Sequence, residues 1–483
     1  MRPIAHPTYT DRMRTLRLSD GRLPITRGTM ADFAHAPLDC LRRLQAEHGD
    51  VAAIEDDDGR RVHFVFSPDL NRQVLTDSKR FHSKFFAMRG GKKSAQRKVS
   101  SGLLSMNGAA HKTDRRIVME PFALKSLDRY HDDVIAVSDA LLADWQPGAT
   151  RDINADMTAY MLRLTCTILF GLDTPELAYK IGRLTEEWVA LNHELGLAAY
   201  VPDLGLTARY DELMESAVEL EGALEEMIAE KRANGFGRDV LSLLIQAKDA
   251  GHLDNTRLLG HMTLLFGAAH LTSAHTLTWT LLLLAQHPDI RRSVDAEIDE
   301  VIGKDEVRPE HLSQLTVLDR VIKESMRVLP ASCYLGRFAA EPVELGPFSL
   351  APGAPVVFSQ FTSHHRAEAF AQPDRFDPSR WESAKPSPYE YLPFGGGSRR
   401  CIGASLGMMQ FLISLPRMLR GRSFQLQAGA EVNYKAHSTM LHPDSPVMMT
   451  LGDAGEHRAV PFGGSIHDLT DFGPASRLKK KTA

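Results

Sequence analysis

One cysteine, Cys401, lies at the end of a glycine-rich turn, and this turn constrains the fold of the chain more than any other segment. Residues 394–403 have the sequence FGGGSRRCIG, in which the glycines allow backbone N–H groups to approach the sulfur without clashes from Cβ atoms. Those donors favour a thiolate over a thiol, and a helix that begins at about Ile402 stabilises the same charge through its positive end. The turn is therefore suited to present this sulfur as a metal ligand.

Two simpler interpretations of the segment fit less well. Phosphate-binding loops contain runs of glycine, but no Lys-Ser or Lys-Thr pair follows here, and Arg399 and Arg400 stand where a dinucleotide-binding fingerprint has its third glycine. A lone cysteine is most often a buried apolar side chain, which is what we predict for Cys40, Cys166 and Cys333. Cys401 is instead suited to be an axial thiolate ligand of haem iron, where electron donation favours O–O cleavage.

Composition narrows the class of protein. Hydrophobic residues make up 43% of the 483 residues and charged residues 24%, which allows a large core and argues against extensive disorder. A net charge of −4 argues against a general nucleic-acid binder. Residues 1–29 contain no continuous apolar run, so they predict neither a signal peptide nor a membrane anchor. The four cysteines lack the spacing of disulfides or zinc sites, which predicts a cytoplasmic protein.

Helical periodicity dominates the chain. We expect helices over residues 38–47, 131–145, 155–170, 176–197, 207–232, 240–250, 255–286 and 318–329. We also expect a hairpin over 51–66, a helix starting at 67–68, and strands at 343–345, 355–359 and 447–450. The prediction is one domain over residues 1–483, mainly α with small β-sheets. Its ends, 1–29 and 454–483, are expected to be weakly ordered, although residues 460–462 could dock.

The spacing Phe-Gly-x-Gly-x-Arg-x-Cys-x-Gly over residues 394–403 resembles the haem-ligand loop of the cytochrome P450 family. The match is complete, and the motif is highly specific. The resemblance implies the cytochrome P450 fold and a haem b cofactor, which is iron protoporphyrin IX. It also implies that Cys401 is the iron ligand and that Phe394 belongs to the loop that contacts the haem.

The same resemblance suggests side chains for the two haem propionates. Residues 108–116 (GAAHKTDRR) resemble the family helix that carries an aromatic residue or His and, one helical turn later, an Arg. This implies propionate contacts from His111 and Arg115. Arg337 and Arg399 match two further family contacts, and bidentate Arg–carboxylate geometry suits each of them. The alternative for any one arginine is a solvated side chain; Arg399 and Arg115 rank above Arg337 and His111.

A buried ion cluster is also implied. Glu324 and Arg327 lie on one face of a predicted helix, and residues 373–378 (PDRFDP) follow. This arrangement resembles the family's Glu-x-x-Arg helix and its Pro-x-Arg-Phe segment, whose arginine joins the first pair. By this resemblance, Glu324, Arg327 and Arg375 form a structural triad near the haem loop.

Residues 264–274 (LLFGAAHLTSA) resemble the family helix that activates oxygen. Small side chains at 267–269 leave room for haem and oxygen, and Thr272 is the implied catalytic hydroxyl. The simpler alternative is that Thr272 bonds back to the carbonyl of Ala268, as Thr does within helices, and both can hold together.

The chain departs from the family one position earlier, where Leu271 replaces the usual Asp or Glu. Without that carboxylate, protons have to come from water held by Thr272 and Ser273, from His270, or from a substrate group. We expect His270 to face the core rather than to relay protons.

A basic segment covers residues 81–104, a region that often lines the family's substrate pocket. Its cations are Lys84, Arg89, Lys92, Lys93, Arg97 and Lys98. A solvated loop is the favoured interpretation. The alternative is a basic entrance for an anionic substrate or for an acidic carrier protein that presents one. The apolar helices around residues 188–210 are expected to form the pocket roof without identifying the substrate.

The predicted function is that of a haem-thiolate monooxygenase of the kind used in secondary metabolism. It would insert one oxygen atom from O2 into a small organic molecule. Electrons would come from a separate ferredoxin or flavodoxin and its reductase, docking near Arg399 and Arg400. Two alternatives remain open: a peroxide-driven or redox-neutral haem-thiolate enzyme, and a non-catalytic haem-binding protein.

Overall fold

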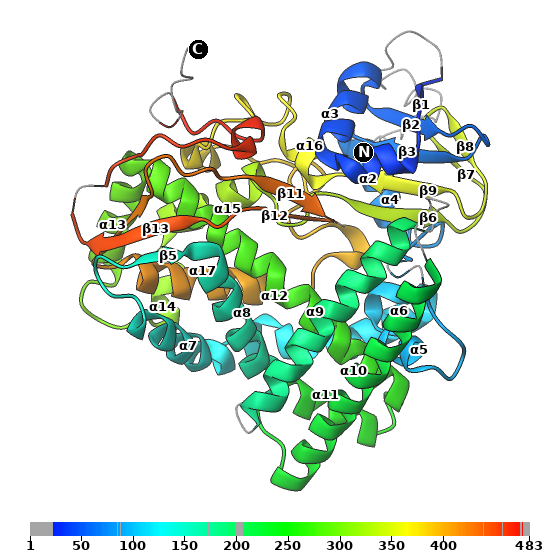
Figure 1. Ribbon diagram of the computed structural model, residues 1–483, viewed down its shortest axis with the longest axis horizontal. Coiled ribbons are helices and arrows are strands. Elements are labelled where there is room, and N and C mark those ends of the chain that lie inside the picture. Colours follow the sequence, from blue (N-terminus) through cyan, green and yellow to red (C-terminus); the bar gives the residue numbers. More distant parts are fainter. Residues whose placement is uncertain are drawn as a thin grey trace, which may run out of the picture.

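Helix α12 (Asn255–Gln286) runs through the middle of the computed structural model, with other helices packed around it (Figure 1). Asp254 caps its start by accepting a hydrogen bond from Arg257 N at 2.8 Å. The helix ends where His287 leaves helical geometry, because the residue before a proline disfavours the α conformation. Every side chain from 274 to 286 is buried, so this half of α12 forms the centre of the core.

The structure describes residues 23–84, 86, 88–171, 174–198, 206–437, 439–455, 457–473 and 476. Within them the helical body is built from long helices joined by short turns. In chain order the other α-helices are α2 (Met30–His35), α3 (Pro37–His48), α4 (Pro68–Thr76), α5 (Ala95–Val99), α6 (Gly108–Val118), α7 (His131–Ala143), α8 (Ile153–Phe170), α9 (Pro175–Ala198), α10 (Leu206–Asn234), α11 (Val240–Asp249), α13 (Pro288–Val301), α14 (Pro309–Leu312), α15 (Thr316–Val328), α16 (Gln360–His364) and α17 (Ala404–Leu419).

The largest sheet lies beside this body and carries the first strands of the chain (Figure 1). Its strand order is β1 (Ile25–Arg27), β2 (Val51–Glu55), β3 (Arg61–Val65), β9 (Pro355–Phe358), β6 (Leu335–Ala339) and β4 (Phe81–His82). A second sheet contains β10 (Arg422–Leu426), β13 (Met448–Asp453) and β5 (Thr150–Asp152). Two hairpins complete the set: β7 (Val343–Leu345) with β8 (Phe348–Leu350), and β11 (Tyr434–His437) with β12 (Met440–Pro443).

Two apolar clusters form the core. The larger one fills the helical body, and the smaller one lies between the large sheet and α4. Residues 457–473, part of the end predicted to be weakly ordered, pack against the body, since Phe462, Ile466 and Leu469 are fully buried. The expected docking of residues 460–462 is therefore confirmed, and at the other end residues 25–27 form β1.

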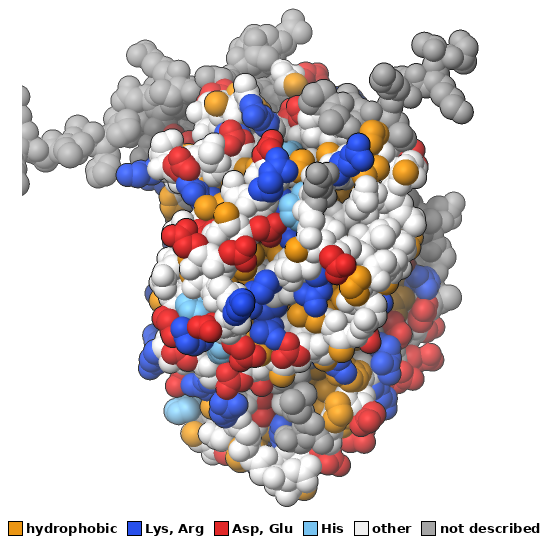
Figure 2. Space-filling model, turned by 90° about the vertical axis from the view of Figure 1, so that its left-hand side faces the viewer, with side chains coloured by type: hydrophobic (Ala, Val, Ile, Leu, Met, Phe, Trp, Pro, Cys, Tyr) orange, Lys and Arg blue, Asp and Glu red, His pale blue; other side chains and the backbone are white. Residues whose placement is uncertain are grey.

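The mainly α fold with small sheets is confirmed, and most predicted helices match the observed ones within two residues. The hairpin over 51–66 is the antiparallel pair β2 and β3. In the described part of the chain, no helix is long and apolar enough to cross a membrane. Figure 2 shows the face over α13 and β13, where basic and acidic side chains are interspersed.

Candidate functional site

The predicted ligand loop contains the short helix η5 (Gly397–Arg399) and ends where α17 begins. The loop closes on itself, because Cys401 N donates a hydrogen bond to Phe394 O at 2.8 Å. Gly397 has φ +62°, and a Cβ atom on it would lie 2.0 Å from the carbonyl oxygen of Leu75. Only glycine fits such a position, so α4 fixes one side of the loop.

Cys401 is the accessible cysteine among the four, which are all free, whereas Cys40, Cys166 and Cys333 are buried as predicted. The surrounding protein nevertheless desolvates its sulfur, and this burial raises the pKa of the Cys401 thiol. The backbone N–H of Gly403 and the charges of Arg115 and Arg400 act in the opposite direction.

The loop therefore stabilises a thiolate less strongly than the sequence predicted. The donors are present, but burial outweighs them in the protein alone, and α17 begins at Ala404, two residues after the expected start. A metal cation is what would overcome this desolvation, because a coordinating thiol is deprotonated by its metal.

Four basic side chains gather near Cys401 from three elements. His111 and Arg115 come from α6, Arg337 from β6 and Arg399 from η5. Burial and the charges of the three arginines lower the pKa of His111 to about 4. Burial lowers the pKa of Arg337 to about 10, with Arg399 as the second cause, and burial together with Arg115 lowers the pKa of Arg399 to about 10.

These arginines are held by backbone oxygen atoms. Arg115 Nη2 donates to Arg400 O at 2.5 Å, and Arg337 Nη1 donates to Gly336 O at 2.7 Å. Arg399 donates to Leu103 O, Met106 O and Asn107 Oδ1. Among the described residues, no carboxylate forms an ion pair with these three arginines. Partly buried cations that repel one another need an anion, so the cluster fits the two propionates of a haem.

Helix α12 forms another wall of the site. Ala268 and Ala269 are exposed although the helix is buried on both sides of them, so the small side chains interrupt the buried length of α12. Thr272 Oγ1 donates to Ala268 O at 2.8 Å, which confirms the simpler alternative for this hydroxyl. Its catalytic role remains a prediction. Leu271 is half-buried beside it and brings no titratable group.

His270 faces the core, as expected. Its Nε2 lies 2.9 Å from Thr158 O on α8, and its Nδ1 lies 2.5 Å from Glu186 Oε1 on α9. Both ring nitrogens therefore lie on the side of α12 that faces α8 and α9. Because positions 270 and 272 lie about 200° apart around a helix, His270 does not point toward Thr272.

The predicted ion triad is wrong in one member. Glu324 and Arg327 are fully buried and form a bidentate pair at 2.9 Å. The arginine that joins them is Arg380, whose Nε donates to Glu324 Oε1 at 2.8 Å. Arg375 is exposed and contacts Gln372 Oε1 instead, while its carbonyl accepts from Arg327.

Sequence reasoning could have found Arg380. The pattern Pro-x-Arg-aromatic occurs twice, at 373–376 (PDRF) and at 378–381 (PSRW), and the structure uses the second copy. Trp381 of that copy also donates its indole N–H to Glu324 Oε2 at 2.9 Å. His364, which was not singled out, is buried between this cluster and the ligand loop.

The basic segment is not a solvated loop over its whole length, so this favoured interpretation is wrong in part. Helix α5 is anchored through Gln96, which is fully buried and accepts a hydrogen bond from Trp188 Nε1 of α9 at 2.6 Å. Lys98 pairs with Glu221 of α10. Lys92 and Lys93, by contrast, are exposed as expected.

Two other cations of the segment line a surface pocket of about 250 Å³. Arg89 and Arg97 reach it from the segment, and Arg257 from α12; Asp254 lies in the same wall. Arg257 pairs with Asp114 and Asp254. Among the described residues, neither Arg89 nor Arg97 forms an ion pair.

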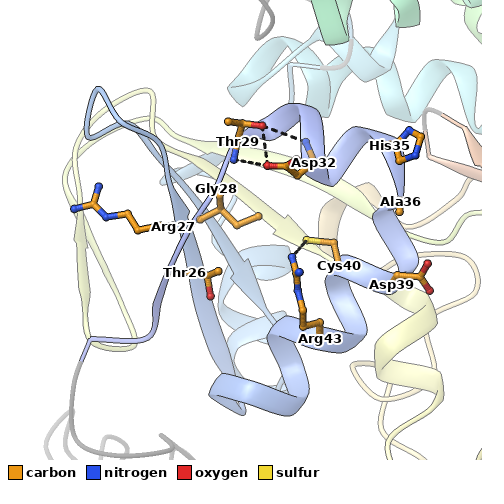
Figure 3. A pocket seen from close by; sticks show the side chains of 11 residues that line it. Thr26, Arg27, Gly28, Thr29, Asp32, His35, Ala36, Asp39, Cys40 and Arg43 are labelled. Atoms are coloured by element: carbon orange, nitrogen blue, oxygen red, sulfur yellow. Dashed lines mark hydrogen bonds between the residues drawn. The ribbon is translucent and has the colours of Figure 1, made fainter.

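A larger pocket, of about 400 Å³, lies between β1, α2 and α3 and shares no residue with the site at Cys401. Figure 3 shows its polar side chains engaged with one another: Asp32 with Thr29, and Arg43 with Cys40. No group of residues with metal-binding geometry occurs in the described part of the chain. By volume alone this pocket would be the candidate functional site, but its side chains do not favour that choice.

Comparison with known proteins identifies the family of the chain. The family model described as Cytochrome P450 matches residues 25–451. The chain is 31% identical to cyclooctat-9-en-7-ol 5-monooxygenase of Streptomyces melanosporofaciens, over 84% of this chain and 89% of that protein. It is 28% identical to pentalenene oxygenase of Streptomyces avermitilis, over 88% of this chain and 94% of that protein.

Solved structures agree at the level of the fold. The haem domain of cytochrome P450DA matches with a TM-score of 0.73 at 20% identity, covering 88% of this chain and 93% of that one. The cyanobacterial CYP120A1 with bound retinoic acid matches with a TM-score of 0.75 at 21% identity, covering 89% of this chain and all of that one. The family match and the 31% identical relative together establish that the chain belongs to the cytochrome P450 family.

Proposed function

We propose that Cys401 is the thiolate ligand of the haem that this monooxygenase family carries. The observation that carries the proposal is an exposed cysteine, Cys401, in a loop flanked by three arginines without carboxylate partners among the described residues. Haem, when bound, supplies a redox-active iron at which O2 is reduced and its O–O bond cleaved.

Arg115, Arg337 and Arg399 are proposed to hold the two haem propionates. Arg337 and Arg399 stay charged at neutral pH, because their lowered pKa values of about 10 still lie well above 7. His111 is neutral at pH 7 with its pKa of about 4, so it contributes a hydrogen bond rather than a charge until an anion is bound. Phe394 supports the loop through its carbonyl bond to Cys401 N.

Thr272 is proposed to hold the proton-bearing water of the site. Its hydroxyl hydrogen points to Ala268 O, which leaves its oxygen free to accept a hydrogen bond from water or substrate. His270 is a poor proton source for this site, because both its ring nitrogens face Thr158 and Glu186 on the other side of α12. Water at Thr272 or a hydroxyl of the substrate therefore remains as the proton donor.

An apolar cyclic substrate fits this site best. One relative is named for cyclooctat-9-en-7-ol, a cyclic alkenol. Another is named for pentalenene. Ala268, Ala269 and Leu271 give the α12 wall an apolar surface without charge. We propose a cyclic alkene or alkenol of this kind, in a pathway of secondary metabolism.

A separate ferredoxin or flavodoxin, with its reductase, is proposed to supply electrons. Arg400 is exposed next to Cys401, and Lys112 and Arg116 are exposed on α6, the helix that carries Arg115. These cations suit an acidic electron carrier. The free cysteines are compatible with a cytoplasmic location.

Two alternatives are each favoured by one specific observation. Leu271 leaves no carboxylate beside Thr272, which favours a peroxide-driven enzyme. Arg89 and Arg97, which have no ion-pair partner among the described residues and line the 250 Å³ pocket, favour an acidic carrier protein that presents the substrate. An apolar free substrate needs neither feature.

The test is reconstitution of the haem-loaded protein with a ferredoxin, its reductase and NADPH, using pentalenene and cyclooctat-9-en-7-ol as probes. We expect a product that carries one ¹⁸O atom from ¹⁸O2. The Cys401→Ser variant should form no product. Product formed at the same rate from hydrogen peroxide without reductase would support the peroxide-driven alternative. Haem loading with substrate binding but no product under either condition would indicate a non-catalytic protein.

A further inference from the structure

His364 is a buried histidine that the haem and oxygen sites do not use. It is the last residue of α16 and is fully buried. Its Nε2 accepts a hydrogen bond from Leu392 N at 2.9 Å. Leu392, which is also buried, is two positions before Phe394, where the ligand motif begins.

This contact specifies the tautomer of the ring. A backbone N–H can only donate, so Nε2 has to be the unprotonated nitrogen and Nδ1 carries the hydrogen. Burial, with the nearby charge of Arg327 as the second cause, lowers the pKa of His364 to about 3. The ring is therefore neutral at neutral pH, where Nε2 serves as the acceptor.

The bonded backbone leads directly to the iron ligand. Leu392 O accepts from Gly395 N at 2.9 Å, and Phe394 O accepts from Cys401 N at 2.8 Å. The loop is thus held at Leu75 on α4, by its own internal bonds, and at His364. Removing the acceptor at His364 would leave a buried N–H without a partner at the start of the loop.

His364 also connects the loop to the buried ion cluster. Its carbonyl accepts from Arg327 Nη1 at 2.9 Å, and its ring lies 5.2 Å from the ring of Tyr391. The hydroxyl of Tyr391 donates to Lys323 O on α15 at 2.9 Å. The cluster around Glu324 therefore reaches the ligand loop through this histidine.

We propose that His364 is a positioning residue for the iron ligand: its Nε2 fixes the backbone of Leu392 and thereby holds the loop that presents Cys401. The role of Cys401 in this statement rests on the proposed function; the hydrogen bond itself does not. His364 touches neither substrate nor the reacting atoms and acts through Leu392.

The experiment compares three variants with the wild type. His364→Leu removes the acceptor at similar size, and His364→Gln offers an amide oxygen near the position of Nε2. His48→Leu is the matched control, because His48 is a buried histidine with a 2.7 Å hydrogen bond to Thr26 in the region of β1. If His364→Leu does not fold, His364→Asn, whose amide is too short to reach Leu392, replaces it.

Two quantities are measured. The first is the hydrogen-exchange rate of the Leu392 amide, in the protein with and without haem. The second is the rate at which the ferrous–carbonyl spectrum changes from the thiolate form to the form without thiolate. We expect His364→Leu to accelerate both by about tenfold, which corresponds to about 1.4 kcal/mol. His364→Gln should remain close to the wild type, and His48→Leu should change neither rate.

Wild-type rates in His364→Leu, or equal acceleration in the Leu and Gln variants, would overturn the proposal. The exchange arm is independent of the ligand assignment, since it also applies to the protein without haem. If Cys401→Ser keeps the thiolate spectrum while Leu392 exchange responds to His364→Leu, the proposed ligand fails and the anchoring of the loop stands.

Discussion

Arg380 and Arg375 offer a direct test of the buried ion cluster, because they occupy the same place in two copies of one motif. Arg380→Ala removes a 2.8 Å hydrogen bond to a carboxylate, Glu324, that is fully buried. Leaving a buried charge without its partner costs about 3–5 kcal/mol. Arg327 and Trp381 still bond Glu324, so we expect the low end, about 3 kcal/mol.

Arg375→Ala is the matched control. The Arg375 side chain is exposed, and within the described part of the chain its one hydrogen bond is to Gln372. The contact of Arg375 with Arg327 is made by its backbone carbonyl, which alanine keeps. We expect a change in the free energy of unfolding within about 0.5 kcal/mol.

The assay is urea unfolding of the haem-loaded variants, followed by far-UV circular dichroism and by haem absorption. Arg380→Ala should unfold at lower urea concentration and retain less haem, while Arg375→Ala should match the wild type. A loss of stability in Arg375→Ala as large as that in Arg380→Ala would refute the assignment of the third member.

Further predictions concern three places: the residues at Thr272, the basic pocket and a buried histidine. Thr272→Ala should raise peroxide released per electron consumed, and Leu271→Glu should lower it if the carboxylate reaches the water at Thr272; the product-to-NADPH ratio measures both. Arg97→Gln should weaken binding of an acidic carrier protein in a salt titration, whereas Lys92→Gln, outside the pocket, should not. Burial, then His442 and His270, lowers the pKa of His275 to about 3. Between pH 6.5 and 3 the unfolded chain then binds one proton more than the folded chain at this site, so stability should fall as pH falls, by up to about 1.4 kcal/mol per unit, and this part of the slope should vanish in His275→Gln.

Local signals explain where prediction from sequence succeeded. Helix α12 was predicted with its observed bounds, because Asp254 caps one end and Pro288 terminates the other. The ligand loop was found through its glycines, which the local backbone requires. Gly397, for example, has a positive φ and lies against the Leu75 carbonyl. Such features depend on a few neighbouring residues, which the sequence displays.

Features that depend on the path of the chain in space could not be predicted. The sequence contains two Pro-x-Arg-aromatic motifs, and only the turn between them decides that Arg380 faces Glu324 while Arg375 faces solvent. Similarly, the charges around α5 predicted a solvated loop, but Gln96 is buried by hydrogen bonds to Trp188 and Asn192 on α9. Those partners lie far along the chain.

The electrostatic balance at Cys401 shows a third limit. Counting N–H donors predicted a stabilised thiolate, whereas the structure shows that desolvation is the largest influence and raises the pKa of the thiol. Desolvation comes from all surrounding atoms, including those of segments that are remote in sequence. His364 was missed for the same reason, since its partner Leu392 lies on another element.

The central claim is that Cys401 supplies the thiolate to the haem iron, and the ferrous–carbonyl absorption spectrum tests it most directly. Wild-type protein should show the red-shifted band of a thiolate-ligated haem. Cys401→Ser should lose that band, because an alcohol does not provide the same soft anionic donor. Full retention of the red-shifted band in haem-loaded Cys401→Ser would contradict the account.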